Sequence, residues 1–231
     1  MKRSIFVTGT DTGIGKTVIT GLLARYLLEK GECPVTQKWV QTGSGVFPAD
    51  LKIHLKLMGK NKNYLKGYLK EAAPYCLKFA ASPHLAAEME NKHISRKKVI
   101  KSFKTLSQRF DRVIVEGAGG VLVPFNKKDF LINLAKELDL AVLLVSGNRL
   151  GAINQTLISI EAIRSSGLEL LGVIFNNLPG QNTKILADNI KVVKRISKEE
   201  VFGALPWEKS GRILYGKFKP CAARIIRKVD R

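Results

Sequence analysis

Gly9-Thr10-Asp11-Thr12-Gly13-Ile14-Gly15-Lys16-Thr17 is the stretch that decides the fold of this 231-residue chain. The short apolar run Ile5-Phe6-Val7 before it is typical of a buried strand, and apolar residues at helical spacing follow it: Val18, Ile19, Leu22, Leu23, Tyr26 and Leu27. A strand, a glycine-rich turn and a helix that begins at Gly-Lys-Thr form the context of a phosphate-binding loop. Its backbone N–H groups and the positive end of the helix attract phosphate oxygens. We therefore predict a nucleoside triphosphate site.

Two residues of this loop carry specific chemistry. Lys16 is expected to reach the terminal phosphates, and the hydroxyl of Thr17 is expected to bind Mg²⁺. The strict spacing of the motif would place its first glycine at position 10, where Thr10 stands, and Gly9 lies one residue earlier. The alternative is a chance Gly-Lys-Thr in a turn, and the flanking strand and helix patterns argue against it.

A second signal is an apolar strand that ends in an acid and a glycine-rich turn. Arg112-Val113-Ile114-Val115 leads into Glu116, and Gly117, Ala118, Gly119 and Gly120 follow. An acid at a strand tip beside a phosphate loop is where nucleotide hydrolases and transferases hold Mg²⁺. The alternative, an acid that caps a glycine turn, explains the strongly apolar run less well.

Residues 34–58 place three further polar side chains near the same edge. A strand is expected over Pro34–Val40, and Lys38 and Thr42 lie at its carboxyl end, where open α/β sheets bind ligands. A helix is expected over about 49–58. Asp50, the one acid between Glu32 and Glu71, is a candidate N-cap of that helix.

The rest of the chain alternates between strand and helix patterns. Strands are expected over 141–145, 170–175 and 201–205, and helices over about 95–109, 130–138, 151–165 and 183–196, while a turn at 80–84 is expected to lead into a further helix through about Asn91. This alternation predicts an α/β fold of the P-loop NTPase type, with a parallel sheet covered by helices on both faces. We expect a single domain over 1–231 with a basic tail from about residue 209. Its apolar residues, Ile213, Leu214, Ile225 and Ile226, indicate that the tail packs against the domain.

Composition limits the partners and the compartment. The formal net charge of +20 suits anionic ligands of any size, so charge alone does not define a site. Six lysines between residues 52 and 70 are interpreted as a solvated face. The three cysteines and three histidines form no metal-ligand spacing, and we expect free thiols, surface or packing histidines, and a cytoplasmic protein. No run is long enough to span a membrane.

With these elements in place, the chain resembles the dethiobiotin synthetase family from about Ile5 to Trp207. The blocks that carry the resemblance occur in the expected order: residues 9–17, Lys38…Thr42-Gly43, Ser82-Pro83-His84, residues 115–120, residues 150–154, Asn176 and Pro206-Trp207. The phosphate loop with its additional residue is what this family has. The glycine-rich blocks alone are shared with related amidases and synthases, and the ordered set is more specific.

The resemblance implies an ATP-dependent ring closure. One amine of 7,8-diaminononanoate takes up CO₂ as a carbamate, the γ-phosphoryl group of ATP activates the carbamate, and the second amine attacks and expels phosphate. Such chemistry needs positioning and charge neutralisation more than a protein nucleophile. Members of the family are soluble, homodimeric enzymes that act on small molecules, so we expect neither a nucleic-acid nor a membrane partner.

The resemblance also implies a role for each matching residue. Lys16 and Lys38 would neutralise the phosphates and the carbamate, as the catalytic pair. Mg²⁺ would be held by Thr17, Asp50 and Glu116. The nucleotide would be bound by Thr12, Gly13, Ile14, Gly15, Lys16, Thr17, Asp50, Glu116, Gly117, Ala118, Gly119, Asn176, Asn177, Pro206, Trp207 and Glu208. The diamine would contact Thr12, Lys38 and Thr42, and its carboxylate would bind the backbone of Leu150, Gly151, Ala152, Ile153 and Asn154 from the other subunit.

The chain departs from the usual pattern of this family at one position, and two other families share part of its pattern. Family members usually carry proline after the catalytic lysine, whereas this chain has Trp39. Partition-type ATPases, which would use the basic surface on DNA, carry a lysine early in the phosphate loop, where this chain has Asp11. Glutamine-dependent amide synthases need a further domain with a nucleophilic cysteine, for which this sequence is expected to be too short.

Overall fold

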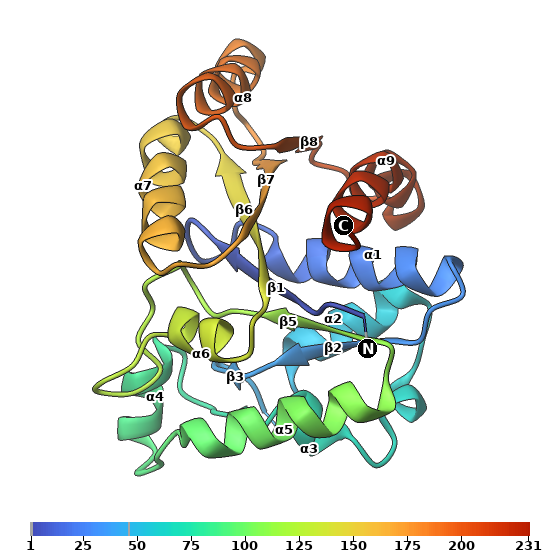
Figure 1. The fold of residues 1–231 in the computed structure, drawn as a ribbon, viewed down its shortest axis with the longest axis vertical. Coiled ribbons are helices and arrows are strands. Elements are labelled where there is room, and N and C mark those ends of the chain that lie inside the picture. The colour runs from blue at the N-terminus through green and yellow to red at the C-terminus, as the bar shows by residue number, and fades with distance from the viewer. Residues whose placement is uncertain (1, 46) are drawn as a thin grey trace.

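A six-stranded parallel sheet forms the centre of the protein. The computed structural model describes residues 2–45 and 47–231. The strands are β1 (Ile5–Gly9), β2 (Pro34–Lys38), β5 (Arg112–Glu116), β6 (Ala141–Asn148), β7 (Leu170–Asn177) and β8 (Val201–Leu205). Their spatial order is β2-β5-β1-β6-β7-β8, and each neighbouring pair is parallel (Figure 1). The phosphate loop leaves β1 near the middle of this sheet, between the carboxyl ends of β5 and β6.

Helices cover both faces of the sheet, as the alternating pattern predicts. They are α1 (Lys16–Glu29), α2 (Ala49–Met58), α3 (Leu69–Ala72), α4 (Pro83–Met89), α5 (Arg96–Arg109), α6 (Leu131–Glu137), α7 (Ala152–Ser165), α8 (Thr183–Ser197) and α9 (Gly211–Val229), with a short 3-10 turn, η1 (Lys62–Leu65). Apolar residues of α1 and α9 form one buried cluster against the sheet. Residues of α5, α6, α7 and α8 contribute to a second cluster. The α/β expectation is confirmed, with β-branched and leucine-rich strands buried between the two layers.

The strand expected over Pro34–Val40 ends earlier than the sequence suggests. β2 stops at Lys38, and Val40–Gln41 forms a separate short strand, β3, that pairs with β4 (Tyr75–Cys76). The break falls at Trp39, whose fully buried ring stacks on Phe6 of β1 at a centroid distance of 5.2 Å. A ring of this size needs the space beside the sheet, so the backbone leaves the ladder after Lys38.

The basic tail is a helix that packs on the sheet. α9 buries Tyr215, Phe218, Cys221, Ala222, Ile225 and Val229, while Ile213 is half exposed, contrary to its expected packing role. Arg112, which is fully buried, joins both chain ends, because it donates to the carbonyl of Arg3 and to the carboxylate of Asp230. The tail is therefore part of the folded unit, and its last residues, at Asp230, lie at the opposite end of β5 from Glu116.

Phe218→Ala is expected to lower the free energy of unfolding by about 3–5 kcal/mol, because it leaves a cavity between α9 and the sheet. Phe218 is fully buried, whereas Lys217 beside it is exposed. Lys217→Ala is the matched control and should change the free energy of unfolding by less than about 0.5 kcal/mol. Urea unfolding of both variants measures this difference. Equal values would contradict the packing of α9.

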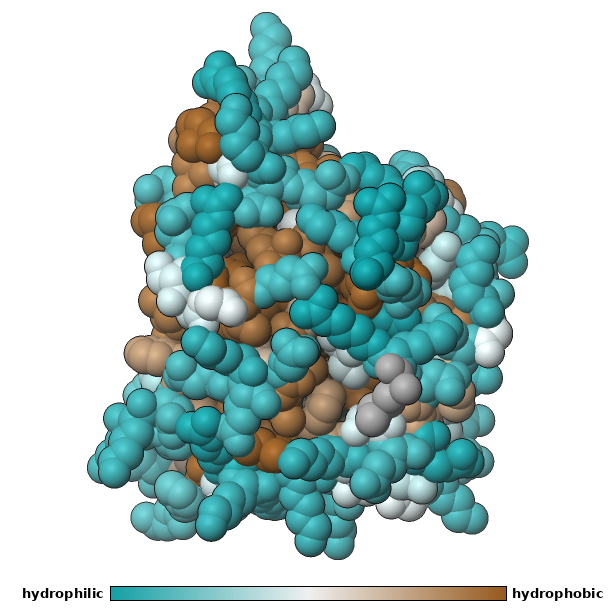
Figure 2. Space-filling model, viewed as in Figure 1, coloured by the Kyte–Doolittle hydropathy of each residue, from teal (hydrophilic) through white to brown (hydrophobic). Residues whose placement is uncertain are grey.

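Charged side chains cover the surface in agreement with the solvated-face interpretation. Figure 2 shows hydrophilic residues over most of one face, and Lys52, Lys56, Lys60, Lys62, Lys66 and Lys70 are all exposed. Among the described residues, no helix combines the length and apolar character needed to cross a membrane.

Candidate functional site

A cleft of about 680 Å³ lies at the carboxyl ends of β1, β2 and β5. The structure brings eleven of the predicted site residues to its walls: Thr12, Gly13, Gly15, Lys16, Thr17, Lys38, Thr42, Asp50, Glu116, Ala118 and Gly119. Val40, Gln41, Ser82 and Pro83 complete the side toward β3 and α4. Strand tips and the start of α1 thus converge on one concave space, as parallel α/β sheets favour.

The phosphate loop is held in a conformation that requires glycine at position 15. Gly15 has a φ of 97°, and a Cβ there would lie 2.4 Å from the side-chain nitrogen of Asn176. Lys16 Nζ donates to the Asp11 carbonyl at 2.5 Å, across the loop. Burial, together with the nearby charge of Lys38, lowers the pKa of Lys16 to about 8. The loop therefore presents the free N–H groups at the start of α1 beside a poorly solvated ammonium, a setting that suits phosphate oxygens.

Lys38 is the centre of the charged cluster in the cleft. Its ammonium lies 2.8 Å from Glu116 Oε1, 2.8 Å from Asp50 Oδ2 and 2.8 Å from the Gly117 carbonyl. Burial alone would lower the pKa of Lys38, but the charges of Glu116 and Asp50 outweigh it and raise that pKa. The bulk of Trp39 leaves Lys38 in the cleft, because the indole is fully buried against Phe6 of β1 and donates to Gln37 Oε1 at 2.9 Å.

Glu116 accepts hydrogen bonds from three different elements. Only 2% exposed, it receives Lys38 from β2, the Thr17 hydroxyl from α1 at 2.9 Å, and His54 Nε2 from α2 at 2.7 Å. Burial would raise the pKa of Glu116, yet the Lys38 charge and the His54 contact together lower it to about 2. The carboxylate is therefore ionised and fixed in orientation.

His54 is the residue that the sequence analysis missed. Isolated histidines were expected to lie on the surface or to serve only packing, but His54 is fully buried and bonded to Glu116. Because the ionised carboxylate of Glu116 accepts, the His54 Nε2 carries the proton. A signal was present: Asp50 and His54 stand four residues apart on α2, so they share one face of that helix.

The oxygens of Thr17, Asp50 and Glu116 fit the preferences of Mg²⁺. The Thr17 hydroxyl lies 2.9 Å from Glu116 Oε1 and 3.4 Å from Asp50 Oδ1, so three hard oxygen donors meet beside the phosphate loop. Mg²⁺ commonly takes one or two carboxylates and completes its shell with phosphate and water. The N-cap position of α2 is Pro48, so Asp50 is free of the capping role and points to the cleft.

The residues predicted to frame adenine lie at the adjoining ends of β7 and β8. Asn176 Nδ2 donates to the Ile14 carbonyl at 2.9 Å and so ties β7 to the phosphate loop. Asn177 accepts from Asn148 at 2.8 Å. The segment Pro206-Trp207-Glu208 follows β8 directly, with Trp207 62% exposed and Glu208 accepting from the Ser210 N–H at 2.9 Å. The exposed indole of Trp207 thus comes two residues after Leu205, which is the ladder partner of Asn176.

Residues 150–154 stand apart from the other predicted site residues. They form the turn into α7, where Leu150 is 77% exposed and Gly151 has a φ of 88°. None of these five residues lines the cleft within the described part of the chain. The structure therefore does not bring the turn and the cleft of one chain together.

Comparison with solved structures identifies the fold. A MinD cell division protein from Aquifex aeolicus matches with a TM-score of 0.56 at 17% identity, covering 98% of this chain and 95% of that one. A pNOB8 ParA bound to nonspecific DNA matches with a TM-score of 0.59 at 14% identity over 99% of each chain. At such low identity these likenesses concern the fold alone, and they support the P-loop NTPase class.

Comparison with sequence families and curated proteins is more specific. A family model described as "AAA domain" matches residues 3–211. ATP-dependent dethiobiotin synthetase BioD 2 of Haemophilus influenzae is 38% identical over 181 residues, which are 78% of this chain and 93% of that protein. ATP-dependent dethiobiotin synthetase BioD of Chlorobaculum tepidum is 37% identical over 206 residues, 87% of this chain and 83% of that protein. The chain belongs to the ATP-dependent dethiobiotin synthetase family.

Proposed function

We propose that this protein makes dethiobiotin from 7,8-diaminononanoate, CO₂ and ATP, as a cytoplasmic enzyme of biotin biosynthesis. The observation that carries this proposal is the position of Lys38: a second buried lysine, on the strand beside β5, shares one cleft with the phosphate-loop lysine. A nucleotide hydrolase needs charge at the phosphates only. A cleft with two separate ammonium groups also suits a second anion, and a carbamate is such an anion.

The proposed reaction forms two C–N bonds at the expense of one phosphoanhydride bond. One amine adds to CO₂ and loses a proton, which gives the carbamate. A carbamate oxygen takes the γ-phosphoryl group from ATP, and ADP leaves. The second amine then attacks the carbonyl carbon, the ring closes, and phosphate departs with the remaining proton going to solvent. Each step requires close approach of two bound groups, and preorganised charge supplies most of the acceleration.

Each predicted site residue would serve the step or ligand that lies nearest to it. The loop N–H groups and Lys16 would bind the terminal phosphates, while Lys38 would face the carbamate. Thr17, Asp50 and Glu116 would hold Mg²⁺, which lowers the charge of the phosphates when bound. Thr12 and Thr42 would contact the diamine, and Asn176, Asn177 and Pro206 to Glu208 would frame adenine. Gly117 fits this scheme because its carbonyl fixes the ammonium of Lys38.

The proposal includes a homodimer in which subunits share their sites. The turn at Leu150–Asn154 lies outside the cleft of its own chain, and Leu150, Gly151 and Asn154 are exposed, as expected of a segment that serves a neighbour. Leu122, Leu150 and Ile158 add large exposed apolar side chains, at 54%, 77% and 59%. In a dimer, the backbone of residues 150–154 would receive the carboxylate of the diamine bound in the other subunit.

Phosphate release from ATP is expected to require both 7,8-diaminononanoate and bicarbonate, because ring closure is the step that expels phosphate. The assay compares phosphate release with both co-substrates, with each one alone and with neither, and adds double-stranded DNA in a parallel series. Vigorous hydrolysis that ignores the diamine and is stimulated by DNA would refute the proposal in favour of a partition-type ATPase. Detection of dethiobiotin by mass spectrometry confirms the product.

A further inference from the structure

Three asparagines, Asn148, Asn177 and Asn189, form a hydrogen-bonded cluster at the carboxyl ends of β6 and β7. The cluster joins the turns that follow these two strands. Asn148 ends β6 and is fully buried, and Asn189 on α8 is 4% exposed. Asn189 Nδ2 donates to Asn148 Oδ1 at 2.8 Å and to the Arg149 carbonyl at 2.9 Å. Asn148 Nδ2 in turn donates to Asn177 Oδ1 at 2.8 Å and to the Leu186 carbonyl at 3.1 Å. One chain of amides thus runs from α8 to the ends of two neighbouring strands.

Burial of the amides of Asn148 and Asn189 has no explanation in the packing of the core. Asparagine is a weak helix former, and an amide removed from water destabilises the fold unless it is hydrogen-bonded. A leucine or valine at position 189 would pack more favourably on the buried face of α8. The amide of Asn189 instead provides two fixed contacts, one to the side chain of Asn148 and one to the backbone carbonyl of Arg149. These two residues directly precede the turn at Leu150–Asn154.

The other side-chain contacts of Arg149 and Leu150, at the start of this turn, are too exposed to fix them, whereas Ala152 at its far side is fully buried and its carbonyl accepts from the Thr156 hydroxyl at 2.6 Å. The Arg149–Asp11 ion pair, at 3.0 Å, joins side chains that are 37% and 46% exposed. The Leu150 N–H reaches Gln181 Oε1 at 3.4 Å on the surface. Exposed pairs of this kind contribute little to holding a conformation, whereas a buried amide network holds its members in one arrangement. The position of Arg149 and Leu150 within the turn therefore depends mainly on Asn189 and Asn148.

We propose that Asn189 is a positioning residue for substrate and nucleotide binding: through Asn148, Arg149 and Asn177 it holds the start of the diamine-carboxylate turn, at Leu150, in register with the adenine end of β7. The inference rests on the proposed function, because that function assigns the two turns their ligands. Lys38 lies on β2 and Glu116 on β5, and their hydrogen bonds go to α1, α2 and Gly117, whereas Lys16 is, among the described residues, linked to the cluster only through the exposed Arg149–Asp11 pair. Loss of the Asn189 amide should weaken the binding of the diamine and of ATP and leave the chemical step unchanged.

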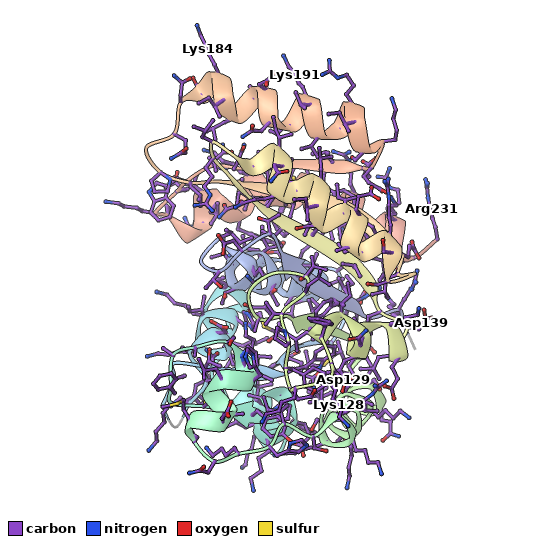
Figure 3. All side chains as sticks on the ribbon, turned by 90° about the vertical axis from the view of Figure 1, so that its left-hand side faces the viewer. Lys128, Asp129, Asp139, Lys184, Lys191 and Arg231 are labelled. Carbon is purple, nitrogen blue, oxygen red and sulfur yellow. The ribbon has the colours of Figure 1, made fainter. Side chains whose placement is uncertain are left out.

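Asn189→Leu is the test variant, and two residues of the same helix provide matched controls. Lys191 projects from the exposed side of α8 (Figure 3), so Lys191→Leu introduces the same residue without touching the cluster. Val193 is fully buried on α8, so Val193→Ala destabilises the helix without removing a contact to the turn. If Asn189→Leu does not fold, Asn189→Ser, which keeps one donor, replaces it.

Asn189→Leu is expected to raise the KM for the diamine and the KM for ATP by about tenfold each, with kcat within about twofold of the original. Hydrogen–deuterium exchange of a peptide covering residues 149–152 should become faster in this variant. Both controls should keep the original KM values, and Val193→Ala should show them despite a lowered melting temperature. An unchanged KM for the diamine, or an equal rise in Val193→Ala, would overturn the inference.

Failure of the proposed function would be visible in a different measurement. If phosphate release by the unaltered protein does not depend on the diamine, the reaction assignment is wrong, whatever the variants do. If that dependence is present and Asn189→Leu leaves both KM values and the exchange of residues 149–152 unchanged, only the positioning role is refuted.

Discussion

Lys38→Met is expected to lower kcat by roughly 10- to 150-fold, the equivalent of losing one charge-assisted contact of about 1.5–3 kcal/mol to the reacting carbamate. Methionine keeps much of the apolar stem and removes the charge. The KM for the diamine should rise, while the dissociation constant of ATP should change by less than about threefold. Lys38 Nζ contacts groups on β5 and α2 rather than on the phosphate loop, so its loss leaves the loop in place.

Lys16→Met provides the contrast. Lys16 lies in the loop itself and would interact with ATP both in the ground state and in the transition state, so its loss should weaken ATP binding as well as turnover. Calorimetric titration of ATP into both variants, together with diamine kinetics, separates the two roles. Equal loss of ATP affinity in both variants would mean that Lys38 is a second phosphate ligand and that the division of labour is wrong.

Stability must be measured beside these kinetics. Removing Lys38 leaves the ionised side chains of Glu116 and Asp50 together in a poorly solvated place, and breaking a buried ion pair destabilises a protein by about 3–5 kcal/mol. Melting curves with and without Mg²⁺ show whether Lys38→Met is folded at the assay temperature. A folded variant with the original kcat would refute a role for Lys38 in the reaction.

Glu116→Gln is expected to lower turnover by at least about tenfold and to raise the Mg²⁺ concentration needed for half-maximal activity. Glutamine keeps the shape of the side chain but loses the charge that Lys38, Thr17 and His54 face. The measurement is a magnesium titration of phosphate release at saturating diamine. If activity persists with an unchanged magnesium curve, Glu116 does not bind the metal.

Glu88→Gln is the matched control for that titration. Glu88 is an exposed acid on α4, and the substitution removes the same charge from the surface. Turnover and magnesium dependence should both remain as in the unaltered protein. A parallel loss in Glu88→Gln would show that the net charge of the surface, and not the buried carboxylate, governs the metal requirement.

The sequence predicts the fold because its local patterns agree with one another. Five of the six strands of the main sheet, all but β2, are largely apolar runs, and four of the five connections between successive strands of this sheet contain a single α-helix. The exception is the strand that was expected to continue to Val40. Its end depends on the stacking of Trp39 on Phe6, a contact between residues 33 positions apart that no local pattern contains.

The candidate site is predictable where it lies in a motif and not where it depends on packing. Lys16 follows from the phosphate-loop motif, Lys38 and Glu116 follow from their places at strand ends, and the structure brings all three to one cleft. From the sequence alone, Asp50 could equally be a helix cap. Its contact with Lys38, which shows that it belongs to the candidate site, forms only when α2 packs beside β2. His54 and the asparagine cluster were missed for the same reason: single polar residues in apolar helices show their partners only in three dimensions.

The close fit between Gly15 and Asn176 limits how chains of this family can be recombined. The amide of Asn176 occupies the space of a Cβ at position 15, and Ile14 likewise lies 2.7 Å from where Gly147 would carry one. The first 20 residues and the segment 147–176 are therefore a matched pair that must be inherited together, since contacting residues do not vary independently. A chimera that joins the amino-terminal part of one relative to the carboxyl-terminal part of another will work best when both members of each pair come from the same parent.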